Sequence, residues 1–366
     1  MNTHGTIFKI TTFGESHGGA LGVVIDGLPS NFEIDLANIA HELGRRKPGQ
    51  SAITTARKEN DENFEILSGV FEGKSTGHPI TIIVRNEDQK SQDYENIKDI
   101  YRPNHADLTY DLKYGIRDYR GGGRSSGRET VSRVIAGAIA KQYLKEKFGV
   151  EIKAFTKQVG EYKAENVNYD FIEKNILRTA DEGVAQKMIE YVEKIKNDGD
   201  SIGGIIECHI KNSPSGLGEP VFDKVKARLA GSMLSIGGVL GFEYGAGFDT
   251  VHLTGKMYNE GFISSPLLQG EENKKNKKDF IHSPHNKYGG ILGGITTGED
   301  IIFRVAVKPT SSIYCPQKTV DKYGNEVDFK IEGRHDACIL PRVVPVIEAM
   351  SAIDILDFVL INNAKK

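Results

Sequence analysis

Apolar residues recur along several stretches of the chain with the spacing of one helix face. From Val131, apolar positions follow at i+3, i+4, i+7 and i+8, and Gly149 lies just past the expected end of that helix. The same periodicity predicts helices over residues 35–43, 131–148, 185–195, 220–233 and 341–355. A chain of 366 residues with such faces is long enough to bury a substantial core.

Other stretches have the character of β-strands, at residues 22–26, 80–84, 204–210, 250–253 and 301–307. Apolar and polar residues alternate in several of them, so one face is expected to meet solvent or to line a site. Strands and helices do not alternate in a regular βαβ rhythm. This favours an α+β fold over a doubly wound sheet.

The chain contains no proline- or serine-rich linker, and its candidate motifs lie at both ends and in the middle. We therefore predict a single domain over residues 1–366. Residues 161–200 and 270–287 are charged and poor in apolar residues, and they are expected to be an exposed helical excursion and a surface loop. Ile-Gly-Gly recurs at 202–204 and 236–238, which fits either an internal duplication or glycine-rich turns beside strands.

The segment from Arg120 to Thr130 (Arg-Gly-Gly-Gly-Arg-Ser-Ser-Gly-Arg-Glu-Thr) carries the clearest candidate chemistry. Its glycines let backbone N–H groups approach a ligand. Ser126 and Glu129 have the spacing of a capping box, which would start the next helix and offer its N-terminus to a phosphate. The G-x-G-x-x-G spacing is absent, and a near match to a P-loop has Arg128 and Glu129 where Lys and Ser/Thr belong. A phosphorylated ligand is predicted, and a dinucleotide fingerprint is not present.

Overall composition narrows the classes of partner. The net charge of −3 argues against a general nucleic-acid binder. The chain has 3 cysteines without a C-x-x-C, so neither a disulfide framework nor a zinc knuckle is predicted. No secretory signal pattern and no apolar run of membrane-spanning length is present. We expect a cytoplasmic protein that binds neither membranes nor nucleic acid.

Several short motifs display titrating or hydroxyl side chains. His17 lies among small residues in Phe-Gly-Glu-Ser-His-Gly-Gly, and it could act as a general acid near neutral pH. His105 lies in Arg-Pro-Asn-His-Ala-Asp, and this motif taken alone favours a turn with a satisfied polar side chain. Asp336 follows Arg334 and His335 and could be a base or an orienting group. No ligand spacing repeats, so no metal is predicted.

Cations gather in two further places. Arg45 and Arg46 lie where a helix should end, a position that favours cations for structural reasons alone. Arg57 follows, and several arginines suit a substrate with more than one anionic group. Lys308-Pro-Thr-Ser-Ser312 follows a predicted strand and could contact phosphate, or form an ordinary Ser/Thr turn.

Together these motifs resemble the chorismate synthase family over nearly the whole chain and in the family's order. The matching segments are 14–18, 44–51, 102–107, 121–130, 289–294, 308–312 and 333–336. The resemblance implies a lyase of the shikimate pathway that converts 5-enolpyruvylshikimate 3-phosphate to chorismate and phosphate. It implies a 1,4-anti elimination that needs reduced FMN without net redox change, a β-α-β sandwich with a pseudo-symmetric core, and a homotetramer.

The resemblance also implies roles for individual residues. His17 would protonate the departing phosphate, His105 would protonate or stabilise the reduced flavin, and Asp336 would assist proton transfer through the flavin. Substrate contacts would come from Arg45, Arg46, Arg57, Arg124 and Arg128. FMN contacts would come from Arg124, Ser125, Ser126, Met257, Tyr258, Gly293, Lys308, Pro309, Thr310, Ser311, Ser312 and Arg334.

The position of Arg46 is linked to NADPH in the family, and Ala52 stands where a second arginine is common. The reductant of the flavin, NADPH on this chain or an external source, is therefore left open. Asn104 replaces a frequent glycine. Two alternatives remain: a flavin-binding redox or regulatory protein that has lost the elimination, and a phosphate-loop nucleotide binder. Joint presence of His17, His105 and Asp336 favours the enzyme.

Overall fold

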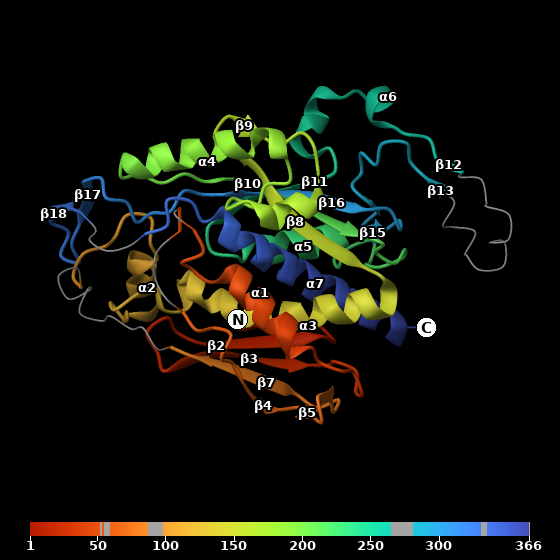
Figure 1. Ribbon diagram of the computed structural model, residues 1–366, viewed down its shortest axis with the longest axis horizontal. Coiled ribbons are helices and arrows are strands. Elements are labelled where there is room, and N and C mark those ends of the chain that lie inside the picture. The colour runs from red at the N-terminus through yellow and green to blue at the C-terminus, as the bar shows by residue number, and fades with distance from the viewer. Residues whose placement is uncertain (52, 55–58, 87–97, 265–280, 331–334, 366) are drawn as a thin grey trace.

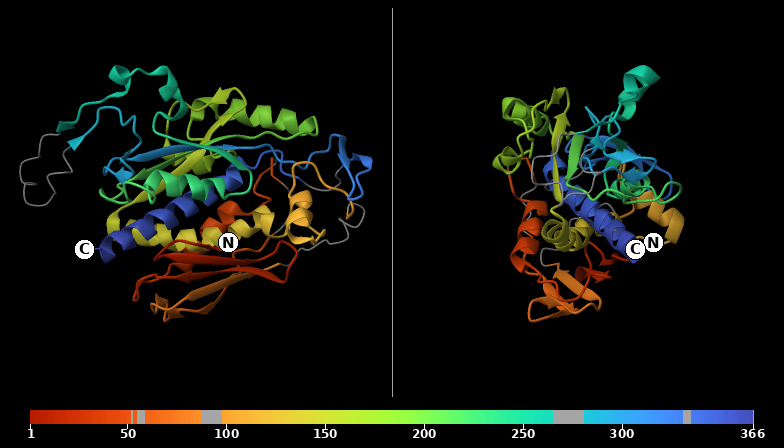
Figure 2. Two further views of the ribbon diagram at one scale, coloured as in Figure 1. Left: turned by 180° about the vertical axis from the view of Figure 1, so that it is seen from behind. Right: turned by 90° about the vertical axis from the view of Figure 1, so that its right-hand side faces the viewer.

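A layer of helices lies between two antiparallel sheets in the computed structural model (Figure 1). The structure describes residues 1–51, 53–54, 59–86, 98–264, 281–330 and 335–365. The central helices are α1 (Leu36–Arg46), α3 (Thr130–Phe148), α5 (Val225–Leu234) and α7 (Leu340–Ala364). Figure 2 shows the same three layers from behind and from the side. The predicted α+β class and the β-α-β sandwich are confirmed.

The first sheet has the strand order β1-β2-β3-β7-β4. Its strands are β1 (Thr3–His4), β2 (Lys9–Gly14), β3 (Ala20–Asp26), β4 (Glu65–Ser68) and β7 (Ile80–Arg85). One face is apolar, with Val23, Ile25 and Ile82 fully buried against the helices. The β2–β3 turn and the end of β7 lie at the same edge, because Ala20 pairs with Arg85.

The second sheet has the order β11-β16-β10-β8-β9 and is also antiparallel between all neighbours. Its strands are β8 (Glu151–Val159), β9 (Tyr162–Lys163), β10 (Gly204–Lys211), β11 (Val239–Tyr244) and β16 (Ile301–Val307). Ile206, Phe303 and Val305 fill the space between this sheet and α7. The five-stranded sheets on either side of the helices match the expected two-sided architecture.

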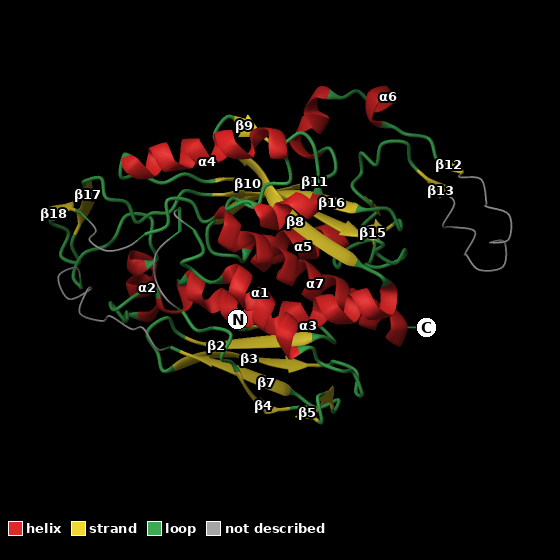
Figure 3. Ribbon diagram, viewed as in Figure 1, coloured by secondary structure: helices red, strands yellow, loops and turns green. Residues whose placement is uncertain are grey.

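Smaller elements surround the sandwich, and Figure 3 distinguishes them from the loops. They include the helices α2 (Asp107–Tyr114), α4 (Glu182–Asn197) and α6 (Gly255–Tyr258), and the strand pairs β5–β6 (Val70–Phe71 and Lys74–Ser75), β12–β13 (Ile263–Ser264 and Ile281–His282), β14–β15 (Ile291–Leu292 and Ile295–Thr296) and β17–β18 (Gln317–Val320 and Glu326–Phe329). Short 3-10 helices occupy Gly123–Ser125, Gly127–Glu129, Tyr169–Lys174 and Gly247–His252.

Some local predictions differ from the structure. The strand predicted at 250–253 is wrong, because Gly247 takes a positive φ of 57° and the Thr250 hydroxyl donates to its carbonyl, which closes a 3-10 turn instead. The segment 161–200 is helical as predicted, but Met188 and Val192 of α4 are fully buried, so only its other face is exposed. Residues 270–280 of the predicted surface loop lie outside the described residues.

Candidate active site

The glycine–arginine loop runs through two 3-10 turns into α3. Ser126 caps the second turn by accepting from the Arg128 N–H at 3.3 Å. The predicted capping box is wrong in its second half: the Glu129 carboxylate pairs with Arg133 at 2.8 Å instead of reaching back to Ser126. This i,i+4 pair joins the last residue of the 3-10 turn to the first turn of α3, which begins at Thr130.

His17 lies directly against this loop. A Cβ atom added to Gly121 would come within 2.3 Å of His17 Nδ1, so only glycine permits the approach. The Ser16 hydroxyl lies 3.1 Å from the same nitrogen. His17 itself is half-buried in the β2–β3 turn. The loop that suggested anion binding and the candidate general acid therefore form one wall.

Arg46 and Arg128 meet behind that wall and share two carboxylates. Glu59 lies 3.0 Å from Arg46 Nη1 and 2.8 Å from Arg128 Nη1. Asp61 lies 3.1 Å and 2.5 Å from the same two atoms and is fully buried. Arg46 also donates to the Gly127 carbonyl at 3.1 Å, which fixes the loop to α1.

The second candidate histidine lies next to the Lys308–Ser312 segment. The Pro103 carbonyl, which can only accept, lies 2.9 Å from His105 Nδ1, so Nδ1 carries the proton and Nε2 accepts from the Ser312 hydroxyl at 3.2 Å. Burial lowers the pKa of His105, and nearby Arg102 lowers it further, so the ring is neutral near pH 7. A neutral ring can exchange a proton with a ligand or stabilise one by hydrogen bonding.

The Lys308 segment connects His105 to Asp336. Lys308 Nζ donates to the Asn104 carbonyl at 3.1 Å and to Ser311 Oγ at 2.6 Å, and burial lowers the pKa of this lysine. Thr310 Oγ1 donates to the Asp336 carbonyl at 2.7 Å. Asn104 has a positive φ of 55°, a conformation that asparagine tolerates better than most residues, which explains its presence where glycine is frequent.

Asp336 is held by an arginine that the sequence did not single out. Arg342, in the first turn of α7, lies 2.5 Å from Asp336 Oδ2 and donates through Nε to the Arg46 carbonyl at 3.3 Å. Arg342 therefore connects Asp336 to the residues around Arg46 and Arg128. The polar contacts therefore connect His105, Asp336, the paired arginines and the His17 wall.

Other predicted residues lie in different surroundings. Arg124 donates to Gly14 O, to Thr12 O and Oγ1 and to Asn2 Oδ1, so it anchors the loop to the first sheet. Ser125 and Ser126 line a cavity of about 440 Å³ that the first residues of the chain, among them Asn2 and His4, also border. Gly293 lies in the β14–β15 turn with a φ of 62°.

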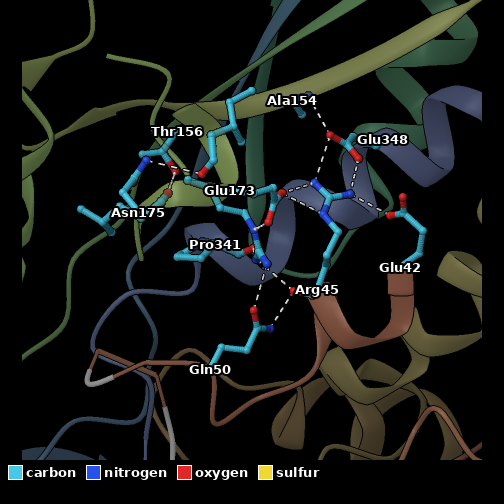
Figure 4. A network of polar contacts seen from close by, with 12 residues as sticks. Glu42, Arg45, Gln50, Ala154, Thr156, Glu173, Asn175, Pro341 and Glu348 are labelled. Carbon is cyan, nitrogen blue, oxygen red and sulfur yellow. Dashed lines mark hydrogen bonds and ion pairs between the residues drawn. The ribbon is translucent and has the colours of Figure 1, made fainter. Parts of the chain in front are cut away.

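Three predictions concern residues that the structure keeps apart from this site or does not describe. Arg45 is buried among Glu42, Glu173 and Glu348, at 2.7, 2.7 and 2.6 Å, so acidic side chains occupy its donors (Figure 4). Met257 and Tyr258 belong to α6, at the opposite end of the molecule from α2, which follows His105 (Figures 1 and 2). Arg57 and Arg334 lie outside the described residues.

Sequence reasoning missed Glu59, Asp61, Asn86 and Arg342 as parts of this region. Glu59 and Asp61 did have a signal, since two carboxylates follow the basic cluster closely in the sequence. Arg342 follows Asp336 by only six residues, which is a local signal for a partner of Asp336. Asn86 had no local signal, because its partners lie about seventy and forty residues away along the chain.

Comparison with known proteins shows the family to which the chain belongs. A family model described as chorismate synthase matches residues 8–360. The chain belongs to the chorismate synthase family. Among relatives, the chorismate synthase of Cytophaga hutchinsonii is 53% identical over 99% of this chain and 98% of its own length. That of Phocaeicola vulgatus is 51% identical over 99% of both chains.

A crystal structure of chorismate synthase superposes with a TM-score of 0.75 at 29% identity, covering 98% of this chain and 93% of that one. The chain is thus a lyase of the shikimate pathway with the family's fold, and it acts on a small-molecule substrate. Among the residues described, no helix is long and apolar enough to cross a membrane.

Proposed function

We propose that the chain converts 5-enolpyruvylshikimate 3-phosphate to chorismate and phosphate by a 1,4-anti elimination with reduced FMN. The observation that carries this proposal is the set of contacts that links His17, the Arg46–Arg128 pair, His105 and Asp336. An elimination needs an acid at the leaving group, a proton acceptor at the carbon and cations for the anions, and these side chains supply each of them.

In this proposal His17 donates a proton to the departing phosphate, and Arg128 stabilises its charge. Asp336, oriented by Arg342, takes part in transfer of the proton lost from carbon. The neutral His105 holds or exchanges a proton at the flavin through a ring that Pro103 and Ser312 fix. Bound reduced FMN supplies the electron density for the reaction, which has no net redox change.

The residues present fit reduced FMN. Lys308 with its neighbouring hydroxyls Thr310, Ser311 and Ser312 offers a cation and donors to a phosphate, and Ser125 and Ser126 border a cavity. Arg57 and Arg334 remain assigned to substrate and flavin. We assign Arg45 a structural role, because its guanidinium is occupied by carboxylates.

We further propose a homotetramer in the cytoplasm that binds no nucleic acid. In such an assembly Met257 and Tyr258, which lie far from His105 in their own subunit, would contact the flavin of a neighbouring subunit. Arg46 is proposed to take part in NADPH binding only through a rearrangement, because Glu59, Asp61 and Thr130 already engage its guanidinium.

The test is anaerobic incubation with 5-enolpyruvylshikimate 3-phosphate and dithionite-reduced FMN, with chorismate followed by absorbance. We expect turnover by the wild type and a loss of roughly 10²-fold in His17→Ala, as for removal of a general acid. His78→Ala is the matched control, since His78 precedes β7 at the end away from His17 and is exposed. Folded protein that binds FMN but makes no chorismate would support the alternative of a flavin protein without the elimination.

A further inference from the structure

Asn86 follows β7 directly and makes four hydrogen bonds, three to the turn that carries His17 and one to Arg128. Its side-chain Nδ2 donates to the Glu15 carbonyl at 3.0 Å and to the Gly18 carbonyl at 2.8 Å. Its backbone N–H donates to the Gly19 carbonyl at 3.2 Å. Its Oδ1 accepts from Arg128 Nε at 3.1 Å.

The partners fix the orientation of this amide. Carbonyl oxygens only accept and a guanidinium only donates, so a flipped Asn86 would lose all three side-chain bonds. An aspartate would keep an acceptor for Arg128 but would set negative oxygens against two carbonyls. A side chain with both donors and an acceptor is required at this position.

The bonds of Asn86 span the turn that carries His17, from Glu15 to Gly19. The position of this turn matters because His17 lies so close to Gly121 that no other residue fits there. A turn displaced by about 1 Å would move the ring away from the glycine loop, and such displacements can cost up to about 10²-fold in rate.

We propose that Asn86 is a positioning residue: it holds the His17 turn and the Arg128 guanidinium in a fixed relation, so that acid and cation act on the same leaving group. The proposal rests on the proposed function for the roles of His17 and Arg128. Asn86 itself touches neither substrate nor cofactor in this scheme. It acts through the main chain of residues 15–19 and through Arg128 Nε.

The experiment is a double-mutant cycle between Asn86→Ala and His17→Ala in the anaerobic assay. We expect Asn86→Ala to lower kcat about tenfold in the wild-type background and by a clearly smaller factor in His17→Ala, because only Arg128 is left to position once the imidazole is gone. If Asn86 had a merely structural role, Asn86→Ala would lower kcat by the same factor in both backgrounds. Such additivity would overturn the proposal.

Asn86→Asp separates the two functions of the side chain. It restores an acceptor for Arg128 but not the two donors to the turn, so we expect kcat to stay as low as in Asn86→Ala. A kcat near that of the wild type would contradict the positioning role of the two Nδ2 hydrogen bonds. If Asn86→Ala fails to fold, by circular dichroism, Asn86→Asp enters the same cycle in its place.

Asn175 provides the matched control. It is also half-buried, donates through Nδ2 to the Phe171 and Thr179 carbonyls, and accepts from the Thr179 N–H. Asn175→Ala should leave kcat unchanged in both backgrounds. Failure of the proposed function is distinguishable, since the wild type would then make no chorismate at all.

Discussion

At the scale of single residues, the pairing of Arg46 and Arg128 with Glu59 and Asp61 determines the electrostatics of the site. Burial alone would raise the pKa of Glu59, but Arg46, Arg128 and Arg342 outweigh it and hold the pKa below its usual range. Glu59 is therefore ionised at neutral pH. A substrate anion that approaches Arg128 must compete with a carboxylate that is already there.

Glu59→Gln tests this competition. Removing one negative charge should lower KM for 5-enolpyruvylshikimate 3-phosphate by up to about tenfold, equivalent to about 1.4 kcal/mol, with little change in kcat. Steady-state kinetics at fixed ionic strength measure the effect. Glu65→Gln is the control, because Glu65 pairs with Arg85 on the exposed side of the first sheet. A higher KM in Glu59→Gln would mean that Glu59 holds the arginines in their binding positions instead.

The adjacent residues Arg45 and Arg46 show what sequence can and cannot predict at this scale. Both were expected to bind substrate by the family resemblance, although a helix end favours cations for structural reasons as well. Successive helix residues point about 100° apart, so Arg45 enters the core beside Glu348 while Arg46 reaches Glu59. The residue types of the site could be predicted, but their partners depend on which distant carboxylate the fold brings near.

At the scale of elements, local periodicity predicted the long helices well and several of the sheet strands poorly. The helix at 131–148 was located to within one residue because its apolar pattern is long. The helix predicted at 220–233 begins only at Val225, because Glu219 and Asp223 form a turn first. Strands β2, β8 and β11 were missed, since strand formation depends on packing against neighbouring strands more than on the local sequence.

The close contact between α3 and α7 depends on Gly137. A Cβ atom at Gly137 would lie 2.2 Å from the Ala349 Cβ, so no side chain fits without separating the helices. We expect Gly137→Ala to destabilise the protein by about 1–3 kcal/mol, as overpacking does in rigid cores. Denaturant unfolding followed by circular dichroism measures the change.

Gly231→Ala is the control for that prediction. Gly231 lies within α5 and has open space where its Cβ would be. The substitution should stabilise the protein by about 0.4–1 kcal/mol through the unfolded chain. Equal effects of the two substitutions would show that helix packing at Gly137 does not limit stability.

At the scale of the whole molecule, one buried cluster joins both sheets through the central helices. It contains Ile25 of the first sheet, Ile206 of the second and Ile347 of α7. A buried ion-pair network follows the same route: Glu348 of α7 contacts Arg45 of α1 and the Ala154 N–H of β8 (Figure 4). Glu348 also pairs with Lys141 of α3. The single domain stays a prediction, and this connectivity implies that both halves unfold together.

Glu348→Gln tests that prediction through its pH dependence. Burial alone would raise the pKa of Glu348, but Arg45 and Lys141 hold it far below its usual range, so the ionised form stabilises the native state. That stabilisation is present above the unfolded pKa, near 4.3 in model peptides and thus about pH 4–5, and is lost as pH falls toward the lowered native pKa. Glutamine keeps the bond from Ala154 but leaves two buried cations short of a carboxylate. We expect a loss of about 3–5 kcal/mol at pH 7 that shrinks as pH falls through this range.

Calorimetry and circular dichroism between pH 7 and pH 3 measure the unfolding transition and its dependence on pH. If the two halves share one core, the variant unfolds in a single transition at lower temperature, and its stability depends less on pH than that of the wild type. Glu219→Gln, which removes only an exposed partner of Lys365, should leave both properties unchanged. Two separate transitions in Glu348→Gln, with only one of them shifted, would contradict the single domain. The reason is that the network bridges α1, α3, α7 and β8, so its loss must affect both halves if they fold as a unit.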